Sequence, residues 1–82
     1  MTPENSRSGQ TSDISDPAAI GAAVRQARKA HGLTQSQLAG LAGTGLRFVS
    51  ELERGKPSVA LDKTLAVLAV LGLRLQVVEA GG

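Results

Sequence analysis

The sequence has no cysteine, tryptophan or tyrosine, and Phe48 is its only aromatic residue. Without cysteine, neither a disulfide nor a thiolate metal site can support the fold. The single histidine, His31, excludes a histidine cluster for a metal or for hydrolysis, and the sequence has no glycine loop of the phosphate-binding type. We therefore expect a protein that is not an enzyme and that has no catalytic residues, no metal and no cofactor.

Long apolar runs are also missing. No stretch approaches the roughly 20 apolar residues that a membrane helix needs. No apolar region follows a positively charged start at the N-terminus, as a secretory signal would require. We expect a soluble, cytoplasmic protein that has neither a membrane nor a small-molecule ligand among its partners.

What remains is a short chain rich in leucine, alanine and valine. Its 82 residues are enough for one domain, and a domain of this size buries only a modest fraction of its surface. Alanine lets helices approach one another closely. The composition therefore favours short, close-packed helices and predicts a mainly α fold.

The charges of the chain are unevenly distributed. The net charge of +2 is modest, but six cations fall in one central stretch in which Glu51 and Glu53 are the only acids. A local basic surface on a nearly neutral chain is the expected electrostatic footprint of a DNA-binding domain, although a solvated helical surface has the same pattern. The cations are Arg25, Arg28, Lys29, Arg47, Arg54 and Lys56.

Local signals predict four helices in the central part of the chain. Asp16 is placed to cap the first helix, Pro17 suits its first position, and Gly32 ends it. Thr34 and Gln37 have the spacing of a capping box at the start of the second. The helices are expected over about 17–31, 34–42, 45–54 and 61–71, with buried positions at Ile20, Val24, Ala27, Leu38, Ala39, Leu41, Ala42, Val49, Leu52, Leu61, Leu65, Val67, Leu68, Ala69 and Leu71.

The second and third predicted helices are joined by a turn, Gly43-Thr44-Gly45. Two short helices with a glycine-bearing turn are typical of a helix-turn-helix unit, whose second helix can enter the major groove of DNA. Gly40 lies inside the second predicted helix, where glycine costs about 1 kcal/mol relative to alanine. We therefore expect close packing at Gly40.

In such a unit, the start of the first helix contacts phosphate and the exposed first turns of the second helix read bases. Arg47 is the strongest reader, because a guanidinium matches the O6 and N7 acceptors of guanine, and Leu46 suits a thymine methyl group. Glu51 either accepts from cytosine N4 or repels the wrong groove. The predicted base-reading residues are Leu46, Arg47, Ser50 and Glu51. The predicted phosphate-binding residues are Gln35, Arg28, Lys29, Arg54 and Lys56.

Some residues of this stretch also have a structural interpretation. Arg28 and Glu53 are placed to pair with each other and so to hold the first helix against the third. Phe48 lies beside the predicted buried stripe of the third helix and is expected at the edge of the core. His31 is in the last turn of the first helix, where the helix dipole favours it.

Residues 73–79 alternate apolar and polar side chains, which is the period of a half-buried strand. A single strand leaves its backbone groups unpaired, and the sequence predicts no second strand. We expect pairing with the same strand of a second copy across a two-fold axis, with Leu73, Leu75 and Val77 as dimerisation residues. The alternatives are extended coil or a further helical turn.

The expected domain organisation follows from these patterns. Residues 1–15 are polar and are expected to form a flexible tail; an arm that follows a DNA groove is the alternative, with Arg7 as its only base. The helix-turn-helix domain spans 16–72, the dimerisation strand spans 73–79, and residues 80–82 form a frayed terminus.

The motif LTQSQLAGLAG, followed by a turn and by FVSELERGK, resembles the lambda-repressor-like, or XRE, helix-turn-helix family over about residues 17–71. Within that family, RFVSELERGKPSVALDKTLAVLAVLGLRLQVV resembles the HipB type of antitoxin regulator. The resemblance implies a four-helix fold with a C-terminal strand that pairs across a homodimer. Gly45 and Leu46 depart from the family pattern, in which polar readers are frequent at these positions.

The resemblance also implies a function in bacteria. HipB-type regulators bind operator DNA upstream of their own operon, on the nucleoid, and neutralise a HipA-type serine/threonine kinase toxin. The resemblance assigns phosphate contacts to Gln35 and Arg28, and base contacts to Leu46, Arg47 and Ser50. The alternatives are a stand-alone or phage-type repressor and an interaction adaptor that does not bind DNA.

Overall fold

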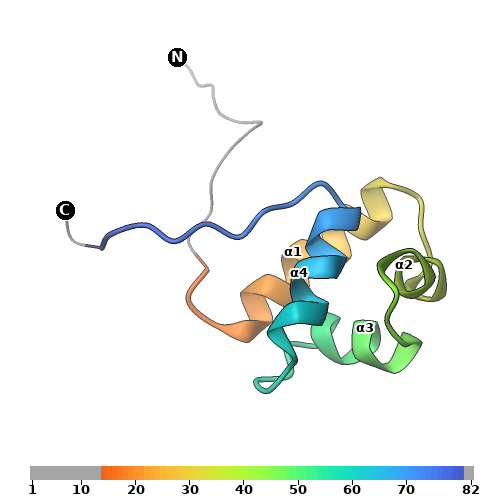
Figure 1. Cartoon of the computed structure of the whole chain (residues 1–82), viewed down its shortest axis with the longest axis horizontal. Coiled ribbons are helices and arrows are strands. Elements are labelled where there is room, and N and C mark those ends of the chain that lie inside the picture. Colours follow the sequence, from red (N-terminus) through yellow and green to blue (C-terminus); the bar gives the residue numbers. More distant parts are fainter. Residues whose placement is uncertain (1–13, 81–82) are drawn as a thin grey trace, which may run out of the picture.

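The computed structural model describes residues 14–80. Its four helices are α1 (Pro17–Ala30), α2 (Gln35–Ala42), α3 (Leu46–Glu53) and α4 (Leu61–Val70). Figure 1 shows them packed into one body, from which the C-terminal residues extend. The prediction of a mainly α, four-helix domain is confirmed. The expected flexible tail lies outside the described residues except at positions 14 and 15. Arg7 and positions 81–82 of the expected frayed terminus also lie outside them.

The predicted N-terminal caps are present. Asp16 Oδ1 accepts a hydrogen bond of 2.8 Å from the backbone N–H of Ala19 at the start of α1. At the start of α2, Thr34 Oγ1 accepts from Gln37 N at 3.0 Å, and Gln37 Oε1 accepts from Thr34 N at 2.9 Å. These bonds satisfy backbone donors that a helix start leaves unpaired, so both helices begin where the sequence predicts.

Each helix contributes one fully buried side chain to the core: Val24 from α1, Leu38 from α2, Val49 from α3 and Val67 from α4. The α3 helix packs against both α1 and α2, and α4 packs against α2. Phe48 is partly buried against this core, as predicted. The core therefore holds α3 by one face only, and its other face stays on the surface.

Four positions predicted to be buried are exposed: three leucines and Ala69. The exposed fraction is 64% for Leu41, 62% for Leu61 and 42% for Leu65. On α4 the buried stripe runs through Thr64, Val67, Leu68 and Leu71 instead, which turns the two leucines away from the core. Thr64 tolerates burial because its hydroxyl donates to the carbonyl of Ala60 at 2.9 Å. On α2 the buried residues are Leu38 and Ala39.

Close packing occurs at a different glycine from the one predicted. A Cβ on Gly40 would have no heavy atom within 4 Å, so the expectation of a close neighbour there is wrong for the described chain. A Cβ on Gly21 of α1 would overlap the carbonyl oxygen of Leu52 and would lie 2.7 Å from that of Glu53. The absence of a side chain at Gly21 is what lets α1 approach the end of α3.

Gly21→Ala is therefore expected to lower the free energy of unfolding by about 1 to 3 kcal/mol, the usual cost of overpacking a core. Gly40→Ala is the matched control, because it is the same change inside a helix but points into open space. The control should raise the free energy of unfolding by up to about 1 kcal/mol. Chemical denaturation of the two variants measures both effects, and equal stability of the two would contradict the close approach.

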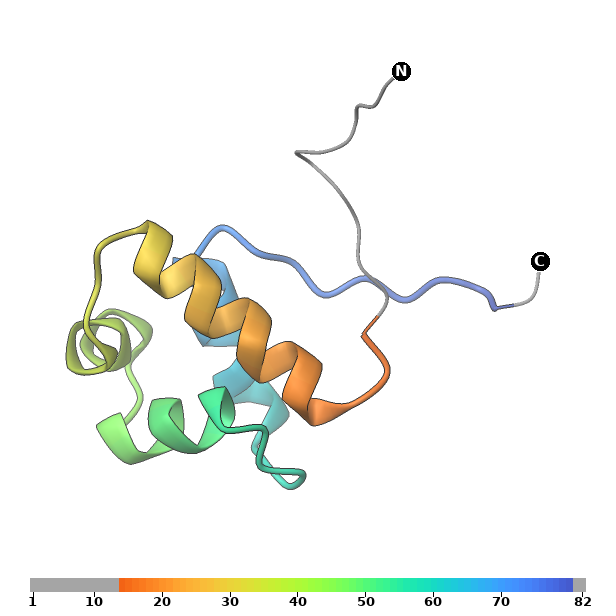
Figure 2. The same ribbon diagram turned by 180° about the vertical axis from the view of Figure 1, so that it is seen from behind.

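Residues 73–79 follow α4 as an extended segment that leaves the helical body (Figures 1 and 2). The described chain contains no strand, and nothing in it pairs with this segment. Its first residue is anchored: the N–H of Leu73 donates to the carbonyl of Leu68 at 2.8 Å, and the Leu73 side chain packs on the core. Farther along, Leu75 is 50% exposed and Val77 is 94% exposed. The predicted pairing between two copies stays a prediction.

Candidate nucleic-acid interface

The turn between α2 and α3 depends on Gly43. This residue has a φ of 71°, a left-handed conformation that side chains disfavour. The next residue, Thr44, donates its N–H to the carbonyl of Ala39 at 2.9 Å, which closes the end of α2. The chain then enters α3, which packs on α2. Together, α2, the turn and α3 form the predicted bihelical unit.

The outward face of α3 carries the predicted base-reading residues. Val49 and Leu52 are buried, and helical spacing places Arg47, Ser50 and Glu51 on the opposite side. The side chain of Arg47 is 90% exposed, and Leu46 is exposed at the first position of α3. Ser50 and Glu51 are partly buried. If this face of α3 enters a groove of DNA, Leu46 and Arg47 are therefore the first of these side chains to reach the bases.

Glu51 is held by two cations. Its Oε2 lies 3.3 Å from Arg47 Nε, one helical turn earlier, and its Oε1 lies 3.2 Å from Lys56 Nζ in the loop after α3. The hydrogen bond from Lys56 is the main reason that the pKa of Glu51 lies below its usual value; the bond from Arg47 adds to it, while desolvation opposes both. Glu51 is therefore a carboxylate with both oxygens engaged.

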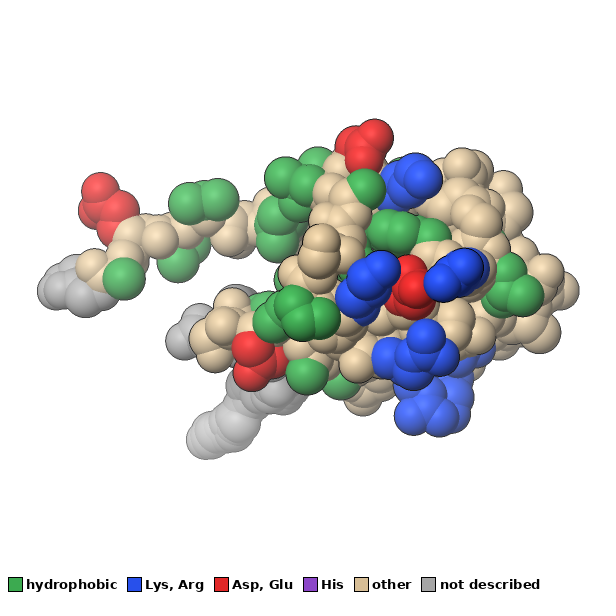
Figure 3. Space-filling model, turned by 90° about the horizontal axis from the view of Figure 1, so that it is seen from below, with side chains coloured by type: hydrophobic (Ala, Val, Ile, Leu, Met, Phe, Trp, Pro, Cys, Tyr) green, Lys and Arg blue, Asp and Glu red, His purple; other side chains and the backbone are tan. Residues whose placement is uncertain are grey.

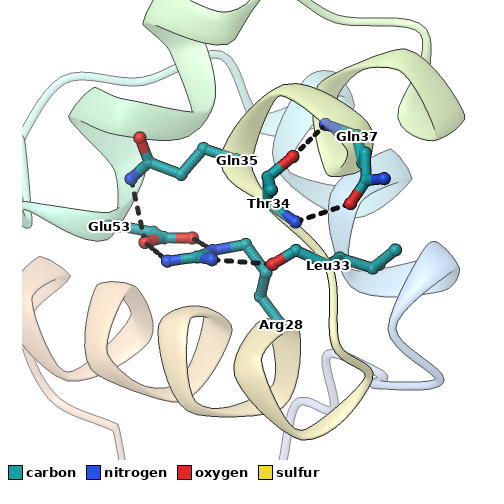
Figure 4. Close-up of polar contacts among 6 residues, drawn as sticks. All are labelled: Arg28, Leu33, Thr34, Gln35, Gln37 and Glu53. Atoms are coloured by element: carbon teal, nitrogen blue, oxygen red, sulfur yellow. Dashed lines mark hydrogen bonds and ion pairs between the residues drawn. The ribbon is translucent and has the colours of Figure 1, made fainter.

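A second ionic group joins the first three helices beneath this face (Figure 4). Arg28 of α1 donates from Nε to Glu53 Oε2 at 2.6 Å and from Nη2 to Glu53 Oε1 at 3.0 Å. Its Nη1 donates to the carbonyl of Leu33 at 2.8 Å. Gln35 Nε2, at the start of α2, donates to Glu53 Oε1 at 3.0 Å. The predicted pair of Arg28 and Glu53 is confirmed.

Burial would raise the pKa of Glu53, but hydrogen bonds from Arg28 and Gln35 outweigh it and hold that pKa below its usual value. The side chains of Arg28 and Glu53 are only 11% and 3% exposed. The structure thus gives Arg28 and Gln35 a role in orienting α2 and α3. Their contacts with phosphate stay predictions.

Other cations flank the unit on the side of α1. Arg25, Lys29 and Arg54 line a shallow groove between α1 and the end of α3. Figure 3, which views the molecule from below Figure 1, shows Lys and Arg side chains gathered on this face with an acidic group among them. Arg25 was not among the predicted phosphate-binding residues. Its spacing of four residues from Lys29, which places the two on one helix face, is the signal that identifies it.

The last side chain with a predicted structural role is His31. It lies directly after α1, where its ring Nε2 is 3.2 Å from the carbonyl oxygen of Leu71. This contact joins the ends of α1 and α4. The predicted effect of the helix dipole on His31 stays a prediction. Within residues 14–80, no group of three acidic or histidine side chains is placed to hold a metal, and no helix is long and apolar enough to cross a membrane.

The bihelical unit presents its second helix outward and has cations on both sides. This arrangement is typical of a DNA-binding transcriptional regulator. The Helix-turn-helix family model matches residues 24–78, and the chain belongs to this family. The match is of the XRE type that the sequence motifs predict.

Known proteins of this kind are similar over most of the chain. The uncharacterized HTH-type transcriptional regulator y4mF of Sinorhizobium fredii (strain NBRC 101917 / NGR234) is 48% identical over 68 residues, which cover 83% of this chain and 90% of the relative. A chain of the HipB-O4 20mer complex is 26% identical, with a TM-score of 0.77 over 85% of this chain and 99% of its own. A chain of the HipA-HipB-O2-O3 complex has the same TM-score and coverage at 24% identity.

Proposed function

We propose that the protein is a sequence-specific repressor that binds a palindromic operator as a homodimer and autoregulates its own operon. The observation that carries this is the outward face of α3, where the side chain of Arg47 is 90% exposed and the opposite face of the helix is buried at Val49 and Leu52. In the proposed complex α3 lies in the major groove, with Leu46, Arg47 and Ser50 at the bases. Lys29 and Arg54 neutralise phosphates, and Arg25 does so as well.

The proposed dimer uses the extended C-terminal segment, in which Leu75 and Val77 are exposed. The alternation of an extended chain places these two side chains on the same side. Pairing across a two-fold axis satisfies the backbone groups of both copies. Figure 3 shows further hydrophobic side chains on the side of the body from which the segment leaves. Leu61 and Leu65 are exposed on α4 and are suited to the same interface. A dimer would then set two copies of α3 at a fixed spacing.

The test is a selection of bound sequences from random duplex DNA, followed by Arg47→Ala. We expect two half-sites related by symmetry, about one helical turn or a multiple apart. Arg47→Ala should weaken specific binding by about 1 to 3 kcal/mol and relax the preference at one base pair per half-site. Titrations of the selected duplex and of its single-base variants measure this, and a variant that binds as the wild type does would contradict the assignment of Arg47.

The finer proposal is that the protein is the antitoxin of a HipA-type kinase and acts on the bacterial nucleoid in the cytoplasm. Its support is the motif resemblance and the fold shared with HipB at 26% identity. Co-expression with a kinase encoded beside it, followed by purification of a complex, tests this. A protein that represses but captures no kinase is a stand-alone repressor, which the relative y4mF, known only as a regulator, equally supports.

The remaining alternative is an adaptor that keeps the fold but does not bind DNA. Binding to phosphates releases counterions, so the logarithm of the association constant falls linearly with the logarithm of salt concentration. A flat dependence for every duplex would favour the adaptor. A steep one favours the repressor.

A further inference from the structure

We propose that Lys56 and Glu51 are positioning residues for Arg47, so that they set which base the protein selects without contacting DNA themselves. This inference rests on the proposed function, since it assigns how the reading side chain is oriented. It gives Lys56 a different role from that of a phosphate contact, and Glu51 a different role from that of a reader of cytosine.

The first observation is the way in which the loop returns to α3. Gly55 has a φ of 82°, a left-handed conformation that reverses the chain at the helix end. The N–H of Lys56 then donates to the carbonyl of Glu51 at 3.1 Å, and its ammonium lies 3.2 Å from the carboxylate of the same residue. The backbone N–H and the side chain of Lys56 thus both bind Glu51.

The second observation is the division of the Glu51 carboxylate. Lys56 takes Oε1 and Arg47 takes Oε2, and the Glu51 side chain is only 20% exposed. A carboxylate whose two oxygens already accept from cations is poorly suited to accept from a base. It is well suited to restrain the long side chain of Arg47, which is otherwise free in solvent.

The third observation is which edge of Arg47 remains available. The bond to Glu51 uses Nε, so the two terminal nitrogens of the guanidinium stay free to face the O6 and N7 acceptors of guanine. Without Glu51, Arg47 would sample many rotamers and would also reach phosphates. Without Lys56, Glu51 would keep only Arg47 as a counter-charge, and its Oε1 would lose the bond that holds the carboxylate in place.

The first part of the test needs no DNA. Nitrogen-15 relaxation of the Arg47 Nε–H group reports how restricted the side chain is in the free protein. We expect restricted motion in the wild type, greater motion in Glu51→Gln and Lys56→Gln, and motion close to the wild type in Lys56→Arg. If Lys56→Gln leaves Arg47 unchanged, the proposal is overturned whether or not the protein binds DNA.

The second part compares the selected operator with an operator changed at the base pair that Arg47 reads. We expect Lys56→Gln to reduce the ratio of the two affinities about two- to fivefold, the range of a surface ion pair. The slope of affinity against salt should stay close to that of the wild type. In an Arg47→Ala background, Lys56→Gln should reduce the ratio no further.

Lys29→Gln is the matched control, because it also removes one positive charge but from a proposed phosphate contact. It should weaken both duplexes equally and lower the salt slope by about 0.9. If Lys56→Gln behaves in this way, Lys56 is a phosphate contact and the proposal is overturned. If Glu51→Gln relaxes a different base pair from Arg47→Ala, Glu51 reads a base itself and the proposal is likewise overturned. A wild type that selects no sequence overturns the proposed function instead.

Discussion

A chain that ends at Leu73 is expected to be monomeric and to bind the selected operator at least about 100-fold more weakly than the full-length protein. Two linked half-sites exceed the affinity of one by roughly 10² to 10⁴, because the second contact becomes intramolecular. The described segment beyond Leu73 has no hydrogen-bond partners in the helical body. Its loss should therefore remove the dimer and leave the fold of each copy intact.

Point variants of the same segment separate pairing from chain length. Val77→Asp places a charge on the side of Leu75 and Val77, where Val77 is 94% exposed, and should abolish the proposed dimer. Gln76→Asp is the matched control on the other side and should keep it. Light scattering gives the oligomeric state, and circular dichroism checks that the helices remain. A truncated chain that stays dimeric would exclude pairing through this segment.

Local signals in the sequence were sufficient for the framework of the fold. Capping residues such as Asp16 and Thr34 act on backbone groups within three residues, and Gly43 acts on the turn that contains it. Such signals need no knowledge of the neighbouring helices. The starts of α1 and α2, and the turn before α3, could therefore be predicted almost to the residue.

The sequence was less informative wherever a result depended on how helices meet. Leu61 and Leu65 follow the same spacing as Leu68, so period alone could not tell which stripe of α4 faces the core. The same holds for the choice between Gly21 and Gly40, since only contact with α3 distinguishes them. A homodimer that covers Leu61 and Leu65 would account for leucine at these two positions.

In the candidate site, too, features that depend on one helix face could be predicted, and features that depend on how elements meet could not. Helical spacing was enough to place Arg47 outward and to propose the pair of Arg28 and Glu53, because each follows from the faces of α1 and α3. The bond from Gln35 to Glu53 was not predicted, since it depends on the angle between α2 and α3. The bond from Lys56 to Glu51 was also missed, because it depends on how the chain returns after α3.

Glu53→Gln is expected to lower the free energy of unfolding by about 3 kcal/mol, because it leaves the guanidinium of Arg28 without its counter-charge at a site that is mostly removed from water. The Arg28 side chain is 11% exposed, and Glu53 accepts bonds from α1 and α2 together. Glu51→Gln is the matched control on the same helix. Its ion pairs are near the surface, so the unfolding midpoint should change little.

The pH dependence of stability provides the second half of this test. The pKa of Glu53 is lower in the folded chain than its ordinary value of 4.5. Its contribution to stability is therefore complete above about that pH and is lost as the pH falls through the folded pKa. The wild type should lose stability toward acid, and Glu53→Gln should lose less over the same interval, so their stabilities should converge. Parallel stability curves for the two proteins would show that Glu53 is not the group that holds α1, α2 and α3 together.

DNA binding should depend on the same carboxylate, because Glu53 holds Gln35 and Arg28 directly behind α3. Acid should therefore weaken DNA binding by the wild type, and Glu53→Gln should bind weakly at neutral pH already.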